Sequence, residues 1–221
     1  MSRRDEFEIT PATVLRAYSI GLFPMAESAD DPTIFWVDPE ARGVFPLDGL
    51  RISRSLAKTV RGDRYEIVVD RDFDAVIDAC ATRAGETWIN PSIRRLYRAL
   101  FDMRAVHTVE ARAGGELVGG LYGVSIGGAF FGESMFHRAR DASKVAFVHL
   151  AARLRKGGWR LLDAQFVTDH LATLGAVEIG RDDYRLRLKE AIAIEPDQSV
   201  WSPDESMSGA AALAAVRAAL D

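Results

Sequence analysis

Cysteine is nearly absent from this chain of 221 residues, and histidine is scarce. The single cysteine, Cys80, excludes an internal disulfide. The histidines are scattered, and no two of them have the i, i+4 spacing of a helical metal site: His107, His137, His149 and His170. The sequence therefore predicts no metal centre.

Long hydrophobic runs are also missing. The longest uncharged stretch, residues 117–132, is too short to cross a bilayer, and its glycines are typical of turns between strands. The charged start of the chain, Met1–Glu6, is followed by no apolar segment of the kind found in secretory signals. We expect a soluble cytoplasmic protein without membrane contact.

Three common catalytic signatures do not occur. The chain has no Gly-x-Ser-x-Gly nucleophile elbow, no Gly-x-x-x-x-Gly-Lys-Ser/Thr phosphate loop and no Gly-x-Gly-x-x-Gly dinucleotide fingerprint. Serine hydrolases of the elbow type, P-loop nucleotidases and classical dinucleotide enzymes are excluded on this ground.

What is present is an ordinary globular composition with one local excess of positive charge. Hydrophobic residues make up 48%, charged residues 27%, and the net charge is −4. Residues 51–64 nevertheless carry five basic side chains and one acidic one. Ser53 and Gly62 predict the ends of a short helix, on which Arg54, Lys58 and Arg61 form one stripe. A solvated helix face and a surface that follows nucleic-acid phosphates are both compatible with this stripe.

Capping residues and hydrophobic periods predict the elements. Helices are expected at residues 11–20, 54–61, 73–82, 91–103, 142–156, 169–174, 182–193 and 210–220. Strands are expected at residues 65–69, 108–112, 116–124, 129–136, 160–165 and 177–179. Residues 22–50, rich in proline and glycine, are expected to be irregular apart from short extended pieces such as 34–37.

The predicted order defines an α+β protein. From residue 90 onward it reads helix, three-stranded meander, long helix, strand, helix, strand, which favours a mixed sheet because a helix between two strands usually joins parallel neighbours. This order is compatible with the fold of the GCN5-related acyltransferases. We expect a small N-terminal α/β domain at 1–64, a GCN5-like catalytic domain at 65–200 with its boundary between 62 and 90, and a helical tail at 201–221.

Polar residues interrupt two apolar strands. Asp163 and Gln165 lie two apart, so both side chains point to one face of their strand. Glu133 lies within the apolar run Phe130–Phe136. Buried ionised groups are costly unless they are paired or used. A structural hydrogen-bond network and a functional site remain equally open on this chemistry alone.

A series of short motifs makes the chain similar to a known family. In chain order they are Gly21-Leu22-Phe23-Pro24-Met25, Trp36 with Pro39 and Arg42, Ile52-Ser53-Arg54-Ser55, Thr87-Trp88-Ile89, the residues 117–124, Gly132-Glu133-Ser134-Met135-Phe136, Ala142-Ser143-Lys144, Asp163-Ala164-Gln165 and Leu174-Gly175-Ala176. The set resembles the leucyl/phenylalanyl-tRNA–protein transferases over most of the chain.

The resemblance implies transfer of leucine, phenylalanine or also methionine from aminoacyl-tRNA to the N-terminal amine of proteins that begin with Arg or Lys, which marks them for degradation. It implies no cofactor and a monomer. Matched to the family's motifs, the catalytic positions are Asp163, Gln165 and Glu133. Those for the terminal adenosine and aminoacyl group are Trp36, Trp88 and Tyr97, with Phe147 and Leu150 as pocket positions. Leu121, Phe130 and Leu162 are apolar strand residues that we expect to complete a pocket for the leucine or phenylalanine side chain. The family also favours the second interpretation of the basic stripe, with Arg54, Lys58 and Arg61 on the tRNA backbone.

An aminoacyl ester is already activated, so the enzyme has to orient an amine against a carbonyl and stabilise the oxyanion. Our hypothesis is that Asp163 polarises Gln165, which orients the amine and helps to accept its proton. Glu133 would hold this arrangement or attract the cationic acceptor.

Two alternatives remain. One is an N-acetyltransferase that uses acetyl-CoA, although the stretch before the long helix, residues 135–143, has no glycine turn for a pyrophosphate. The other is a tRNA- or degron-binding module without catalysis, against which the intact Asp163, Gln165 and Glu133 argue.

Overall fold

The computed structural model describes residues 9–82 and 87–218. The charged start of the chain considered as a signal, and the last residues of the predicted tail helix, lie outside this range. Within the described part, no helix is both long and apolar enough to cross a membrane.

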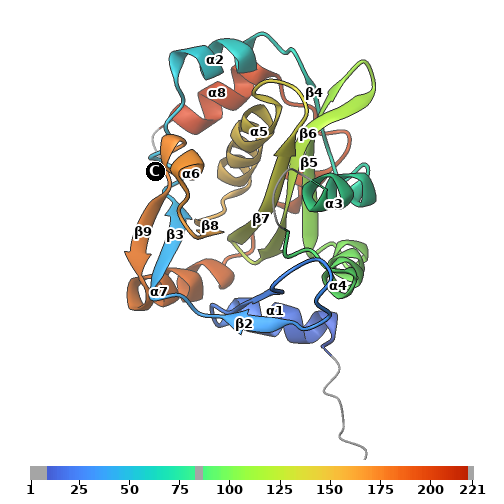
Figure 1. Ribbon diagram of the computed structural model, residues 1–221. Coiled ribbons are helices and arrows are strands. Elements are labelled where there is room, and N and C mark those ends of the chain that lie inside the picture. Colours follow the sequence, from blue (N-terminus) through green and yellow to red (C-terminus); the bar gives the residue numbers. More distant parts are fainter. Residues whose placement is uncertain (1–8, 83–86, 219–221) are drawn as a thin grey trace, which may run out of the picture.

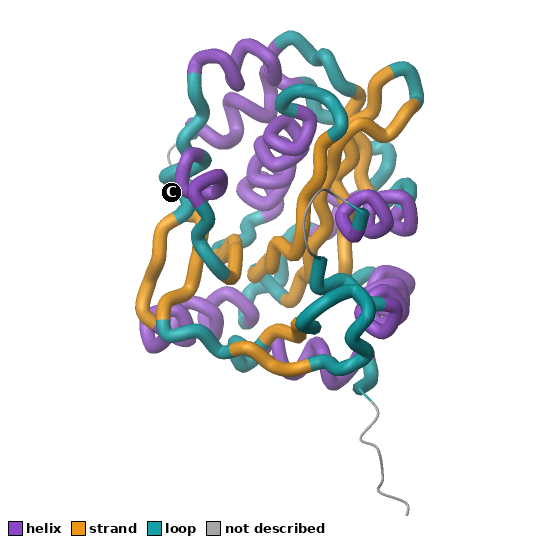
Figure 2. Tube along the Cα trace, in the orientation of Figure 1, coloured by secondary structure: helices purple, strands orange, loops and turns teal. Residues whose placement is uncertain are grey.

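A seven-stranded mixed sheet organises the molecule, in the order β4-β5-β6-β7-β8-β3-β9. Figure 2 shows its strands between the helices. Its strands are β3 (Ala41–Phe45), β4 (Glu66–Val69), β5 (Val106–Ala113), β6 (Glu116–Ile126), β7 (Ala129–His137), β8 (Leu161–Gln165) and β9 (Val177–Gly180). Two further strands, β1 (Phe23–Met25) and β2 (Phe35–Val37), form a separate antiparallel pair. The expected α+β class and mixed sheet are confirmed.

Most helices begin where the sequence predicts, because a side-chain cap accepts a backbone N–H of the first turn. Thr10 and Pro11 start α1 (Pro11–Ser19), Ser53 starts α2 (Arg54–Arg61), and Asn90 starts α4 (Pro91–Asp102). The other helices are α3 (Phe73–Ala81), α5 (Ala142–Gly157), α6 (Asp169–Thr173), α7 (Arg181–Ile192) and α8 (Gly209–Arg217), with a 3-10 turn η1 (Gln198–Trp201).

The sheet separates two hydrophobic cores. One contains buried residues of α2, α5 and α8, and α5 packs directly against α8. The other contains buried residues of α1, α3, α4 and α7. Figure 1 shows α5 with α2 and α8 above the centre of the molecule, and α1, α3, α4 and α7 around the remaining sides.

Strand β3 is the main departure from the expected elements. Its segment was predicted to be irregular, yet it lies between β8 and β9 and pairs antiparallel with both. The sequence does not predict this strand because it contains or adjoins Pro39, Gly43 and Pro46, and proline and glycine usually indicate loops. The sheet thus includes a strand from residues 1–64, and the expected domain division between 62 and 90 stays a prediction.

Parallel pairing occurs at β7 and β8, which the long helix α5 connects. The pairing begins at Ala129↔Leu161 and ends at Phe131↔Asp163, although β7 continues to His137. Beyond that point the strands separate, and the sheet opens at the carboxyl end of a parallel pair, a common place for ligand sites.

Candidate active site

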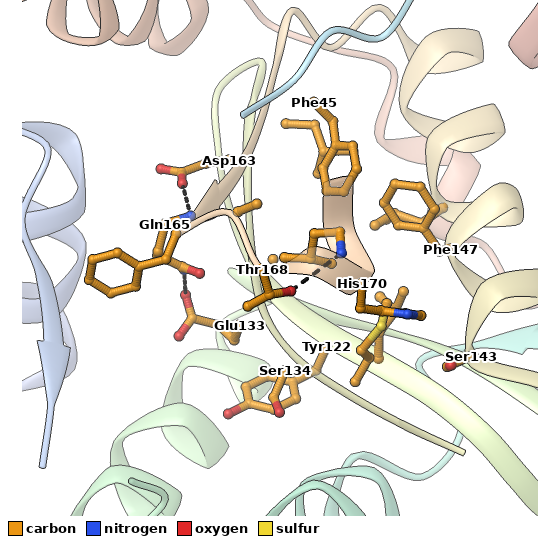
Figure 3. A pocket seen from close by; sticks show the side chains of 18 of the residues that line it. Phe45, Tyr122, Glu133, Ser134, Ser143, Phe147, Asp163, Gln165, Thr168 and His170 are labelled. Atoms are coloured by element: carbon orange, nitrogen blue, oxygen red, sulfur yellow. Dashed lines mark hydrogen bonds between the residues drawn. The ribbon is translucent and has the colours of Figure 1, made fainter. Parts of the chain in front are cut away.

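A cavity of about 680 Å³ lies in this opening. Its wall combines β7 from Gly132 to His137, β8 from Leu162 to Gln165, and side chains of α5, α6 and β1. The lining is mostly apolar, and Figure 3 shows the polar side chains of Asp163, Gln165 and Glu133 together at one side of it. Pockets of this size and lining are typical of sites for organic ligands.

β-Bulges deliver the polar residues to the cavity. On β7, Gly132 pairs with Gly123 and Ser134 with Tyr122, which leaves Glu133 as the extra residue. On β8, Asp163 pairs with Val44 and Gln165 with Gly43, which leaves Ala164 as the extra residue. A bulge changes the direction of nearby side chains, so both strands turn a polar group toward the same place.

Glu133 is the centre of a compact hydrogen-bond network. Tyr18 donates its hydroxyl to Oε1 over 2.6 Å, and Tyr97 donates to Oε2 over 3.0 Å. The side-chain amide of Gln165 donates to Oε1 over 2.8 Å. The two tyrosine oxygens are themselves 2.5 Å apart. The tyrosines of helices α1 and α4 thus hold the Glu133 carboxylate of β7 in place.

Burial is the largest influence on Glu133 and raises its pKa to about 7, while the hydrogen bonds from Tyr18 and Tyr97 lower it. The charge of Asp163 raises the pKa further, and Arg42 lowers it. A carboxylate with a pKa near neutrality can take up or release a proton under cellular conditions. Such shifts are common at catalytic sites.

Asp163 is fully buried and is held by a guanidinium. Arg42 donates Nη2 to Oδ2 over 2.7 Å, and its Nε lies 3.1 Å from both oxygens. Tyr184 also donates its hydroxyl to Oδ2. The Arg42 guanidinium lies 4.5 Å from the ring centres of Phe23 and Tyr184. The Asp163 carboxylate is therefore paired, hydrogen-bonded and shielded, as a buried charge requires.

Gln165 joins the two carboxylates. Its backbone N–H donates to Asp163 Oδ1 over 2.7 Å, and its side chain reaches Glu133. Its φ of 56° lies in the left-handed region, which is costly for a residue with a side chain. Our hypothesis had Asp163 polarising the side chain of Gln165. The structure instead places Asp163 on its backbone N–H and Glu133 on its amide.

The predicted pocket residues separate into two groups. Those that line the cavity are Trp88, Leu121, Glu133, Phe147, Leu150, Leu162, Asp163 and Gln165. Three others lie around it. Tyr97 reaches it through Glu133, and Trp36 pairs in register with Pro24, a lining residue. Phe130 is fully buried in the core and stacks on Trp201, with ring centres 5.6 Å apart.

The basic stripe lies on the outer face of α2. Arg54, Lys58 and Arg61 are exposed, while Leu56 and Val60 are buried beneath them. Among the described residues, no carboxylate lies within 4.0 Å of the three cations. Their charges are therefore available to a partner.

Several site residues had no sequence-based role. Arg42 was part of a motif, but nothing in the chain linked it to Asp163, 121 positions away. Tyr18 and Tyr184 occupy ordinary positions of amphipathic helices, where a buried tyrosine is usually a core residue. The signal for them is indirect: buried carboxylates such as Asp163 and Glu133 require hydrogen-bond partners from elsewhere in the chain. Among the described residues, no group of three or more His, Cys, Asp or Glu side chains could hold a metal ion.

A largely apolar cavity at the end of a parallel strand pair, with buried and mutually connected acid and amide groups on its wall, is the arrangement expected of an enzyme active site. Comparison with known proteins then gives the family. The profile of leucyl/phenylalanyl-tRNA protein transferase matches residues 44–189, and that of the same family's N-terminal domain matches residues 7–40. The chain belongs to the leucyl/phenylalanyl-tRNA protein transferase family.

Close relatives agree over nearly the whole chain. A leucyl/phenylalanyl-tRNA–protein transferase of Afipia carboxidovorans is 58% identical over 98% of both chains. Relatives with the same name from two strains of Rhodopseudomonas palustris are 55% identical over 98% of this chain and 99% of theirs (strain TIE-1), and 54% over 99% and 100% (strain HaA2).

Among solved structures, a functionally unknown conserved protein from Staphylococcus epidermidis matches 79% of this chain and 66% of its own. The TM-score is 0.40 and the identity 12%. A likeness this weak assigns no fold family, and the relation to GCN5 is not confirmed by it.

Proposed function

We propose that the protein transfers leucine or phenylalanine, and also methionine, from aminoacyl-tRNA to the N-terminal amine of proteins that begin with Arg or Lys. This step marks them for degradation, and the protein acts as a cytoplasmic monomer. The observation that carries the proposal is the position of Gln165, whose backbone is held by Asp163 and whose amide is held by Glu133 at the wall of an apolar cavity. The family and its named relatives support the donor and the reaction.

The donor fits the cavity in two parts. Leu121, Phe147 and Leu150 provide an apolar wall for a leucine or phenylalanine side chain. Such a wall separates side chains that differ by one methylene by only about 1–3 kcal/mol, so methionine should also be accepted. Trp88 offers an aromatic face for the terminal adenosine, and base stacking of this kind contributes about 1–3 kcal/mol.

The chemistry requires orientation and proton transfer. The Gln165 amide donates its N–H to Glu133, so its carbonyl oxygen remains to accept an N–H of the attacking amine. Glu133, with a pKa near 7, takes up the proton that the amine loses as the new C–N bond forms, and that proton returns to the ribose oxygen of the tRNA when its ester bond to the amino acid breaks. Asp163 acts through the backbone of Gln165 and is a positioning residue in this scheme.

The proposal also assigns roles to the N-terminal segment and to the part of the chain that carries the cavity. The N-terminal segment through residue 64 carries the exposed cations of α2, which face the tRNA backbone. The β7–α5–β8 unit with its separating parallel strands supports a GCN5-like catalytic domain.

The test is a transfer assay with labelled leucyl-tRNA and a peptide that begins with arginine. We expect label on the peptide, none on a peptide with an acetylated N-terminus, and at least a hundredfold lower rate for Asp163→Ala. Transfer by Asp163→Ala at the wild-type rate would contradict the role of the Asp163–Gln165 pair.

A further inference from the structure

The first turn of α5 opens onto the active-site cavity at the side opposite to the acid cluster. Ser143 lines the cavity, and Figure 3 shows it across from Glu133. The N-cap residue Asp141 has a left-handed backbone and its side chain caps no N–H of the helix. Within the described chain, the N–H of Ala142 donates to Ala139, whereas those of Ser143 and Lys144 have no acceptor.

The hydroxyl of Ser143 adds a second and independent signal. This side chain is 97% buried, with a relative exposure of 3%, and its surface that remains belongs to the cavity. No hydrogen bond to Ser143 Oγ is found in the described part of the protein. The hydroxyl, which has no partner among the described residues, faces the cavity, so it can donate a hydrogen bond to a ligand bound there.

The lysine that follows Ser143 brings a positive charge to this helix start. Burial lowers the pKa of His170, and Lys144 and His137 lower it further, so His170 adds no charge at neutral pH. His137 and His170 both line the cavity. The Asp141 carboxylate is the opposing charge at this helix start, and its Oδ2 lies 3.7 Å from Nε of Arg140. The balance favours an anion.

We propose that the first turn of α5 binds a phosphate of the donor's single-stranded 3′ end, through the N–H groups of Ser143 and Lys144, the Ser143 hydroxyl and the Lys144 ammonium. This inference rests on the proposed function. A nucleoside that enters the cavity is followed by a phosphodiester, whose single negative charge needs donors outside the apolar wall. Free N–H groups at a helix start, aligned with the helix dipole and next to a lysine, provide them.

The test compares two minimal donors with the full-length protein. One is the phenylalanyl ester of adenosine, and the other is the same ester carrying a 5′-methyl phosphate, which adds one negative charge and no second base. We expect the phosphorylated donor to have a KM about tenfold lower in the wild type. Lys144→Met and Ser143→Ala should each reduce this KM ratio, the former to about two. Lys189→Met, which removes an exposed lysine of α7, is the matched control and should keep the ratio.

The readout is a ratio within each variant, so a loss of folded protein cancels. A ratio near one in the wild type, or a high ratio that both variants keep, would overturn the phosphate site while leaving the proposed function intact. Failure of both donors would instead count against the proposed function.

Coenzyme A offers the same phosphate chemistry from another source. We expect it not to compete with the phosphorylated donor. Competition that disappears in Lys144→Met would assign the site to a coenzyme pyrophosphate and overturn the assignment to the nucleic-acid donor.

Discussion

Arg42 and Asp163 form a buried ion pair in which the guanidinium Nη2 lies 2.7 Å from the carboxylate Oδ2, and both side chains are at most 1% exposed. Arg42 also donates Nη1 to the carbonyl of Gly21 over 2.9 Å. One side chain therefore ties the N-terminal segment and β3 to the strand that carries Asp163 and Gln165. Several consequences of this arrangement can be measured.

Replacing Arg42 by methionine should leave the Asp163 charge buried without a counterion. Because breaking a buried pair by removing one partner is costly, we expect the free energy of unfolding to fall by about 3–5 kcal/mol. Denaturant unfolding measures this loss. Arg185→Met, which removes the half-exposed pair with Asp38, is the control and should cost at most about 1 kcal/mol. Equal effects of the two variants would contradict the importance of burial at Arg42.

Gly43 allows β3 to lie against the end of β8. A Cβ at this position would come within 2.8 Å of the Phe166 carbonyl carbon and 3.1 Å of the Val167 nitrogen, which are backbone atoms that cannot turn away. Gly43→Ala should therefore lower both stability and transfer, by about 1–3 kcal/mol in unfolding free energy. Gly180→Ala on the neighbouring strand, where a Cβ meets nothing within 4 Å, is the control. Equal stability of the two variants would show that the close approach is not limiting.

Glu133 should make stability depend on pH. Burial raises its pKa from 4.5 to about 7, so the folded protein holds this proton more tightly than the unfolded chain does. The resulting stabilisation is complete below about pH 4.5 and is lost as the pH rises through 7. Relative to Glu133→Gln, which cannot ionise here, the wild type should lose about 1–3 kcal/mol of unfolding free energy between about pH 5 and pH 8. A difference that stays constant over this range would contradict the raised pKa.

At position 165 a glycine should give a more stable protein than an alanine, which is the reverse of the usual order of the two residues in helices and strands. Both substitutions remove the hydrogen bond to Glu133, but only glycine adopts a φ of 56° without strain. We expect Gln165→Gly to be about 1 kcal/mol more stable than Gln165→Ala in thermal or denaturant unfolding. Both variants should lose at least a hundredfold in transfer rate, because the amide itself is missing. Substantial transfer by either variant would exclude the amide from the reaction.

The exposed cations of α2 should control the salt dependence of tRNA binding. Reversing Arg54 and Lys58 to glutamate removes two positive charges and adds two negative ones, and each lost phosphate contact should lower the salt slope by about 0.7–0.9. The dissociation constant measured at several salt concentrations gives this slope. Arg187→Glu with Lys189→Glu, on α7, changes the net charge equally and is the control. An unchanged slope in the α2 variant would return the stripe to a solvated helix face.

The accuracy of the sequence-based elements follows from where the information lies. The start of α1 depends on Thr10 and Pro11, and that of α4 on Asn90 and Pro91, all within a few residues of the helix they begin. The meander is equally local, because glycine turns separate its strands. Strand β3 was missed since its partners, β8 and β9, lie more than a hundred residues further along the chain.

The candidate site also combines features that short stretches of sequence indicate with features that depend on distant partners. Alternation along a strand predicted that Asp163 and Gln165 share a face, whereas the bulge at Ala164 interrupts the alternation, and the contact between the two runs from the Gln165 backbone N–H to the Asp163 carboxylate. The bulges at Glu133 and Ala164 could not be predicted, because a bulge depends on the register of two strands. Phe130 was predicted to line the pocket but lies in the core, since the sequence does not distinguish an apolar strand residue that fills the core from one that lines a pocket.

Most of the helices and strands, the family and the identity of the polar residues could be predicted from the chain alone, because caps, turns, periodicity and ordered motifs all lie in short stretches of sequence. The tertiary structure alone decided which of these residues meet. Only folding places Arg42 on Asp163, and Tyr18 and Tyr97 on Glu133, and only there does burial raise the pKa of that carboxylate. The physical reason is that desolvation and pairing depend on distances in space, which residues far apart in sequence acquire together.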